Sequence, residues 1–126
     1  DGGAGVAVTV TFVCAGAADI DLRRVSVVAD RVRHAARLVD MPCNELHTDA
    51  YVEHVREVCA DIGAEEPTVI AGTELRDRGF GGLWGVGKAA EHLPALVHLK
   101  YVPEGGGDGS APVVFLGKGI VYDTGG

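Results

Sequence analysis

Cysteine is scarce in this chain of 126 residues, which holds only Cys14, Cys43 and Cys59. Their number is odd, their spacing is wide, and no two of them form a C-x-x-C pair. These features argue against a disulfide framework. They predict reduced, mostly packed thiols in a cytosolic-type compartment.

Basic residues and long apolar runs are also lacking. Lys and Arg number 11 against 18 Asp and Glu, a formal net charge of -7, which argues against nucleic acid or an anionic membrane as the main partner. No apolar run approaches the length of a membrane span, and there is no signal-peptide pattern. Because the chain starts at Asp1 without a Met, we expect its N-terminus to have been cut from a longer sequence. The 47% hydrophobic content is enough for the core of one domain.

Two common hydrolase signatures are missing as well. There is no G-x-S-x-G elbow, and the histidines show neither H-x-x-x-H nor H-E-x-x-H spacing. Each histidine is therefore interpreted as a surface or hydrogen-bonded residue and not as a zinc ligand. The five are His34, His47, His54, His92 and His98.

The segment GLWGVGKA, residues 82–89, fits G-x-x-x-x-G-K but places Ala89 where a phosphate loop needs Ser or Thr. That hydroxyl holds the magnesium ion, and alanine cannot replace it. One interpretation is nucleotide binding. The other is a closely packed glycine-rich loop with Lys88 in solvent, and the missing hydroxyl favours this second interpretation.

Two helices are predicted in the first half of the chain. Apolar residues at steps of three and four from Leu22 to Val39 indicate one helix, which Pro42 ends. Its arginines could form a phosphate patch, but a solvated face is the more ordinary interpretation. Thr48 is a plausible N-cap for a second helix over residues 48–62, with Gly63 as its stop.

Four strands and a short helical turn complete the pattern. Strands are expected at residues 6–13, 67–72, 94–102 and 113–116, with a turn after Thr73 and loops rich in glycine after it. The fold class is therefore α/β, with a mixed, mostly parallel sheet flanked by helices. We expect the helices of residues 22–40 and 48–62 to pack on that sheet.

The last strand leads into GKGIVYDTGG, residues 117–126. Functional residues gather at the carboxyl ends of strands in α/β sheets, and the flanking glycines let the backbone approach an ion closely. Lys118 and Asp123 could form an ordinary surface ion pair, which spacing alone favours. Alternatively, both could ligate a divalent metal ion, with the lysine amine neutral because a dication favours the free amine.

Three blocks of the sequence resemble the leucyl aminopeptidase family of cytosolic metallo-aminopeptidases. They are residues 29–55, residues 81–101 and, most specifically, VVFLGKGIVYDTGG at residues 113–126, which looks like the start of the family's metal-binding signature. Cys43, Tyr122 and Thr124 suggest a divergent, aminopeptidase-like branch. The resemblance implies the family's mixed sheet sandwiched between helices.

The resemblance also implies a chemistry. Members remove N-terminal residues from peptides with two divalent ions, which are zinc or manganese and also magnesium. By position, Lys118 matches a lysine that ligates one metal ion, and Asp123 matches a carboxylate that bridges both ions. The family's catalytic lysine and arginine and its other ligands would lie after Gly126, so we expect no catalytic residue in this chain and no activity from it alone. A non-catalytic interaction fragment is the alternative, because exposed sheet edges invite pairing.

The resemblance further suggests how the chain is organised and where it acts. Residues 1–28 would be the end of a preceding region or a linker with a strand, and residues 29–126 the N-terminal portion of the catalytic domain. The whole protein is expected to be a cytoplasmic homo-hexamer acting on peptides.

Overall fold

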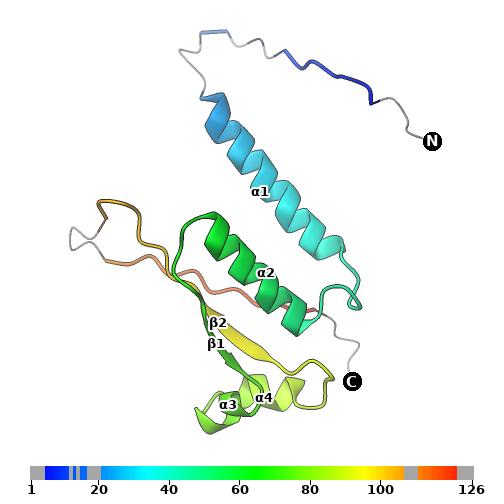
Figure 1. Cartoon of the computed structure of the whole chain (residues 1–126), viewed down its shortest axis with the longest axis vertical. Coiled ribbons are helices and arrows are strands. Elements are labelled where there is room, and N and C mark those ends of the chain that lie inside the picture. Colours follow the sequence, from blue (N-terminus) through cyan, green and yellow to red (C-terminus); the bar gives the residue numbers. More distant parts are fainter. Residues whose placement is uncertain (1–4, 12, 14, 17–20, 107–110, 122–126) are drawn as a thin grey trace. The chain divides into compact units, whose positions relative to one another are not determined.

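The computed structural model describes residues 5–11, 13, 15–16, 21–106 and 111–121. The chain divides into two units, Asp1–Arg37 and Leu38–Gly126. Within it the helices and strands follow in the order α1 (Leu22–Asp40), α2 (Thr48–Asp61), β1 (Thr68–Ala71), α3 (Thr73–Asp77), α4 (Gly81–Gly87) and β2 (Ala95–His98) (Figure 1).

Helix α1 confirms the helix predicted from the apolar steps. The Asp21 carboxylate starts it by accepting hydrogen bonds from the backbone N–H groups of Arg23 and Arg24, at 3.1 and 3.3 Å. The helix buries none of its residues, and Val28 and Val32 are each 63% exposed. Among the described residues of its own unit nothing buries this apolar stripe, so the expected packing of α1 on the sheet stays a prediction.

Helix α2 is the central element of the second unit, and its ends explain its length. The side chain of His47, not of Thr48 as predicted, caps its N-terminus by accepting a hydrogen bond from the Ala50 N–H. At the other end Gly63, at φ 66°, closes a Schellman motif in which the Ala64 N–H donates to the Cys59 carbonyl at 2.8 Å. The predicted glycine stop is therefore confirmed.

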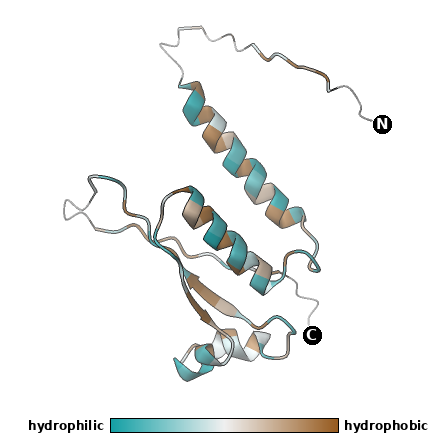
Figure 2. Cartoon of the chain, in the orientation of Figure 1, coloured by the Kyte–Doolittle hydropathy of each residue, from teal (hydrophilic) through white to brown (hydrophobic). Residues whose placement is uncertain are grey.

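Strands β1 and β2 form an antiparallel pair in which Val69 lies opposite Val97 and Ile70 opposite Leu96. These are the predicted strands of residues 67–72 and 94–102, shortened to four residues each. Figure 2 shows the hydrophobic residues of both strands in brown. The α/β class is thus supported by helices and a small sheet, and the ladder that the described residues contain is antiparallel.

The core of the second unit lies where α2 and α3 meet this sheet. Helix α2 contacts β2 and α3 contacts β1, which accords with the expected packing of the second helix. Cys59 and Leu75 are 1% and 0% exposed. Cys59 is thus a packed free thiol as predicted, whereas Cys43 is free but exposed, because it lies in the turn before α2 and outside this core.

Two predicted strands are absent from the described residues. Positions 6–11 and 13 are extended without a ladder, as is the apolar run 113–116. Val13 is 93% exposed and Leu116 is 95% exposed. Strand-like composition is not enough, because a strand is stabilised by a hydrogen-bonded neighbour and a buried face. Phe12 lies outside the described residues.

The segment expected to be a glycine-rich loop forms a helix instead. Residues 81–87 make up α4, which holds the glycines of the phosphate-loop look-alike in helical geometry, with Lys88 exposed at the C-cap. A phosphate loop needs a strand before its loop and backbone N–H groups turned to the ligand. The helix therefore removes the nucleotide-binding interpretation and keeps the packing one.

Helix α3 is held to α4 by side chains as well as by chain continuity. The Arg76 guanidinium lies 6.0 Å from the centre of the Trp84 ring, and it also donates to Asp77 at 2.8 Å. This hydrogen bond from Arg76 holds the pKa of Asp77 below its ordinary value. Both charged groups are exposed, so the pair fixes orientation more than it adds stability.

The segment between α4 and β2 folds back so that Leu93 and Pro94 lie against Gly72 and Gly87. The Gly72 N–H donates to the Pro94 carbonyl at 2.9 Å. A Cβ at Gly87 would lie 2.6 Å from Pro94 Cγ, and one at Gly72 would lie 3.0 Å from Leu93 Cδ1. Only glycine permits this approach at position 87, and the approach fixes the path of residues 88–94.

None of the described helices has the length and apolarity needed to cross a membrane.

Alanine at Gly87 and at Gly85 should change stability in opposite directions. Gly87→Ala places a methyl group against the Pro94 ring and should cost about 1–3 kcal/mol of unfolding free energy. A Cβ at Gly85 would have nothing within 4 Å of it, so Gly85→Ala should add roughly 0.5–1 kcal/mol through helix propensity. Urea unfolding followed by circular dichroism measures both, and equal effects would refute the close approach.

Truncation of Leu75 should show where the core lies. Leu75→Ala removes a fully buried side chain and should lower the unfolding free energy by about 3 kcal/mol. Leu83→Ala is the matched control, since Leu83 is 42% exposed and its loss should cost far less. The same urea titration compares the two, and similar costs would contradict the assignment of the core.

Candidate functional site

Lys118, the first predicted metal ligand, is exposed in an extended segment. Asp123, the second, lies outside the described residues, so the pairing of the two stays a prediction. The neighbouring Gly119 passes close to α2, where a Cβ would lie 3.1 Å from Tyr51 Cε1. Gly117 has open space at the corresponding position. The glycines therefore do allow a close approach, at one of the two positions and toward an aromatic ring.

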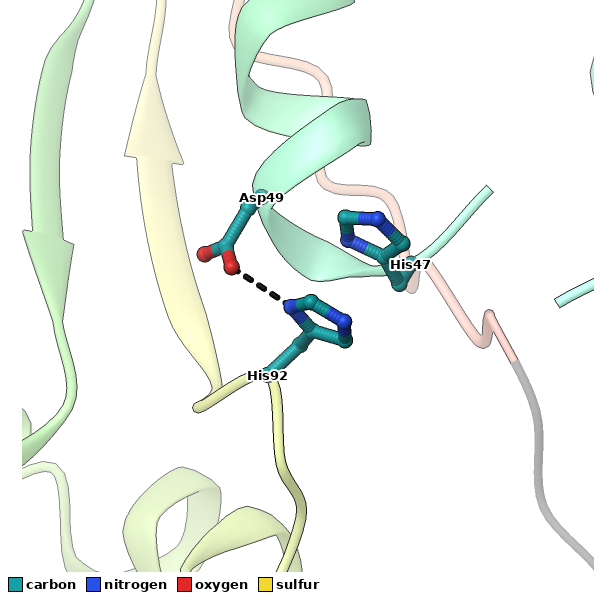
Figure 3. A group of neighbouring side chains, drawn as sticks. All are labelled: His47, Asp49 and His92. Carbon is teal, nitrogen blue, oxygen red and sulfur yellow. Dashed lines mark hydrogen bonds and ion pairs between the residues drawn. The ribbon is translucent and has the colours of Figure 1, made fainter. Parts of the chain in front are cut away.

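A second group of chemically useful side chains surrounds the start of α2. His47 is the N-cap of this helix, and Asp49 lies in its first turn. His92 comes from the segment between α4 and β2, whose path the close contacts at Gly72 and Gly87 fix. The three residues lie together in Figure 3, where the His92 ring points to the Asp49 carboxylate and the His47 ring lies beside it.

The distances within this group are short. His92 Nδ1 lies 2.6 Å from Asp49 Oδ2. The rings of His47 and His92 are stacked, with centroids 3.5 Å apart and planes 9° from parallel. One ligand atom from each of the three residues falls within 4.8 Å of the others. Two imidazole nitrogens and a carboxylate oxygen at this spacing are a donor set that can bind a metal ion.

Each donor in the group already has a hydrogen-bonding role. A nitrogen and a carboxylate oxygen 2.6 Å apart need a proton between them, so the His92–Asp49 contact holds one. His47 Nδ1 accepts from the Ala50 N–H at a long 3.4 Å, which leaves that nitrogen without a proton. Both histidines are thus hydrogen-bonded, which agrees with that part of the interpretation drawn from the sequence.

Sequence reasoning missed this group because its members are distant in the chain. Asp49 is the acidic residue in the first turn of the helix, an ordinary position for a carboxylate that does not single it out as a ligand. His92 is 43 residues further along, which no zinc-binding spacing rule covers. The H-x-D pattern at residues 47–49 is the one local signal, and by itself it is too short to identify a site.

The similarity to known proteins covers most of the chain. Residues 33–126 match the profile described as the cytosol aminopeptidase family, catalytic domain. The chain is 52% identical over 97 residues to a probable aminopeptidase, NPEPL1, of Homo sapiens, which covers 77% of the chain and 18% of that protein. It is 40% identical over 119 residues to leucine aminopeptidase 1 of Caenorhabditis elegans, which covers 94% of the chain and 23% of that protein.

A solved structure agrees with these matches. The apo structure of leucyl aminopeptidase from Trypanosoma cruzi is 43% identical to the chain, with a TM-score of 0.51. The alignment covers 53% of this chain and 13% of that one. The chain therefore belongs to the cytosol aminopeptidase family and carries part of the catalytic domain. It spans about a fifth of the length of these two curated relatives.

The contact between Gly119 and Tyr51 can be tested by substitution. Gly119→Val should displace the Tyr51 ring, because even a Cβ there is closer than ordinary contact distance, whereas Gly117→Val should leave the ring in place. The chemical shifts of the labelled Tyr51 ring in nuclear magnetic resonance spectra report its position. Equal shifts from both variants would show that residues 117–119 do not pass this face of α2.

Proposed function

We propose that this chain is part of a metal-dependent aminopeptidase that removes N-terminal amino acids from peptides. The observation that carries the proposal is the family match over residues 33–126, which includes the segment GKGIVYDTGG. Lys118 and Asp123 are the proposed metal ligands. Within the family's chemistry a pair of divalent ions, zinc or manganese and also magnesium, acidifies a water molecule and polarises the scissile carbonyl when bound.

The described residues fit one part of such a site. Lys118 is exposed and ends in an amine, which can serve as a nitrogen donor in its neutral form. The open space around Gly117 leaves room for a ligand, while Tyr51 backs Gly119 on the other side. In this proposal Lys118 and Asp123 hold the ions, and the glycines on either side of Lys118 set the path of the backbone.

Two donors do not complete a dinuclear site. Each ion takes several oxygen or nitrogen ligands, so Lys118 and Asp123 would need further donors to hold a pair of ions in place. The proposed catalytic lysine and arginine have no counterpart among residues 1–126, so we infer that the chain alone has no peptidase activity. Peptides, a homo-hexameric assembly and a cytoplasmic location are the partners and setting proposed for the whole protein.

A second candidate function is that of a non-catalytic interaction fragment. The apolar run at residues 113–116 is 80–95% exposed, and the sheet of the described residues has two strands with open edges. Exposed apolar strands and open edges favour pairing with another chain. Co-purification with a full-length family member would support this function, and a monodisperse monomer that ignores that partner would count against it.

Substitution of Lys118 or Asp123 should greatly lower the aminopeptidase activity of the chain extended beyond Gly126. Asp123→Asn removes the proposed bridging charge and Lys118→Met removes the amine, so each should lower kcat/KM at least about 100-fold, or roughly 3 kcal/mol of transition-state stabilisation. Hydrolysis of aminoacyl amides with manganese or zinc is the measurement. Lys100→Met is the control, because Lys100 lies elsewhere in an ion pair with Glu65.

Two results would contradict the proposal. One is a complete lack of activity of the extended protein with every divalent metal tried. The other is activity that Asp123→Asn leaves unchanged. Loss of activity in both variants with retention in the control would support Lys118 and Asp123 as ligands.

A further inference from the structure

We propose that His47, Asp49 and His92 form a binding site for one zinc-class transition-metal ion. None of its ligands is Lys118 or Asp123, and the proposal does not rest on peptidase activity. The three residues offer two imidazole nitrogens and one carboxylate oxygen within 4.8 Å of one another. Imidazole favours zinc, cobalt, nickel and copper, whereas magnesium and calcium prefer sites made of oxygen donors alone.

The backbone holds the ligands in place from two sides. His47 and Asp49 are fixed by the start of α2, where residues 47–49 enter the first turn. His92 is fixed by the returning segment, since the Thr48 hydroxyl donates to the His92 carbonyl at 3.5 Å and Gly72 holds Pro94. A site whose ligands are positioned before the ion arrives loses little conformational freedom on binding.

The ion requires a small rearrangement of the side chains. Zinc binds nitrogen and oxygen at about 2.0–2.2 Å, which places neighbouring ligand atoms about 3.3 Å apart. The 2.6 Å contact between His92 and Asp49 must therefore open slightly. Stacked rings cannot both direct an in-plane lone pair at one ion, so one ring must turn.

Of the two rings, that of His47 can turn with the smaller loss of hydrogen bonding. Its capping bond to the Ala50 N–H is 3.4 Å long, and that bond is weak at this distance. His92 keeps its orientation while the ion takes the place of the hydrogen on Nδ1, which in a neutral imidazole moves to Nε2. Asp49 is exposed, so a fourth position is open to water.

Binding should be measured on the full chain carrying Asp123→Asn, so that the proposed dinuclear ligands contribute as little as possible. The probe is zinc chloride, titrated against a chromophoric chelator. His47→Asn and His92→Gln remove one imidazole each, and asparagine keeps the capping role at position 47. His98→Gln is the matched control, because His98 is exposed at the end of β2.

The expected result is one zinc ion per chain, with an affinity that His47→Asn and His92→Gln each lower about tenfold or more and that His98→Gln leaves unchanged. Circular dichroism of each variant checks that α2 is intact. Equal affinities in all variants, or no zinc binding by the Asp123→Asn chain, would overturn the proposal.

A further measurement separates metal coordination from a structural role of the histidines. Cobalt chloride should produce visible absorption bands of a low-coordinate site, and these should disappear in His92→Gln. Zinc binding without these cobalt bands would contradict coordination by this group.

Discussion

The close return of residues 88–94 over Gly72 and Gly87 is the constraint on which the second unit depends. It continues into the antiparallel pairing of β1 with β2, because the Gly72 N–H bonds Pro94 just before β2 begins. That sheet in turn gives α2 and α3 a surface on which to bury Cys59 and Leu75. The same return brings His92 to the first turn of α2. One close backbone approach therefore fixes the strand pairing, the core and the histidine group.

Charge has a smaller role than packing in this structure. Ion pairs such as those of Arg56 with Glu66 and of Lys100 with Glu65 join side chains that are partly or largely exposed. Pairs of this kind contribute little each, because water competes for both partners. The His92–Asp49 contact is shorter, at 2.6 Å, and it joins the segment before β2 to the first turn of α2, where the ring of His47 stacks on that of His92.

Much of the local structure could be predicted from residue patterns. The periodicity from Leu22 predicted the first helix correctly. Gly63 ends the second helix, as predicted, because its positive φ suits the Schellman turn. Patterns were misleading at residues 113–116 and in α4. A strand needs a hydrogen-bonded neighbour, which composition alone cannot supply. Glycines can lie in a short helix where a neighbouring segment packs closely against it, as Pro94 does at Gly87.

The sequence by itself determined the family of this protein, the bounds of its main helices and two of its strands. It also identified GKGIVYDTGG, residues 117–126, as the segment that resembles a metal-binding signature, because motifs and periodicity are local in the chain. Only the tertiary structure decided that the sheet of the described residues is antiparallel, that Gly119 passes Tyr51 and that His47, Asp49 and His92 meet. Each of these depends on contacts between residues distant in sequence, and such contacts arise when the chain folds back to bury its apolar surface.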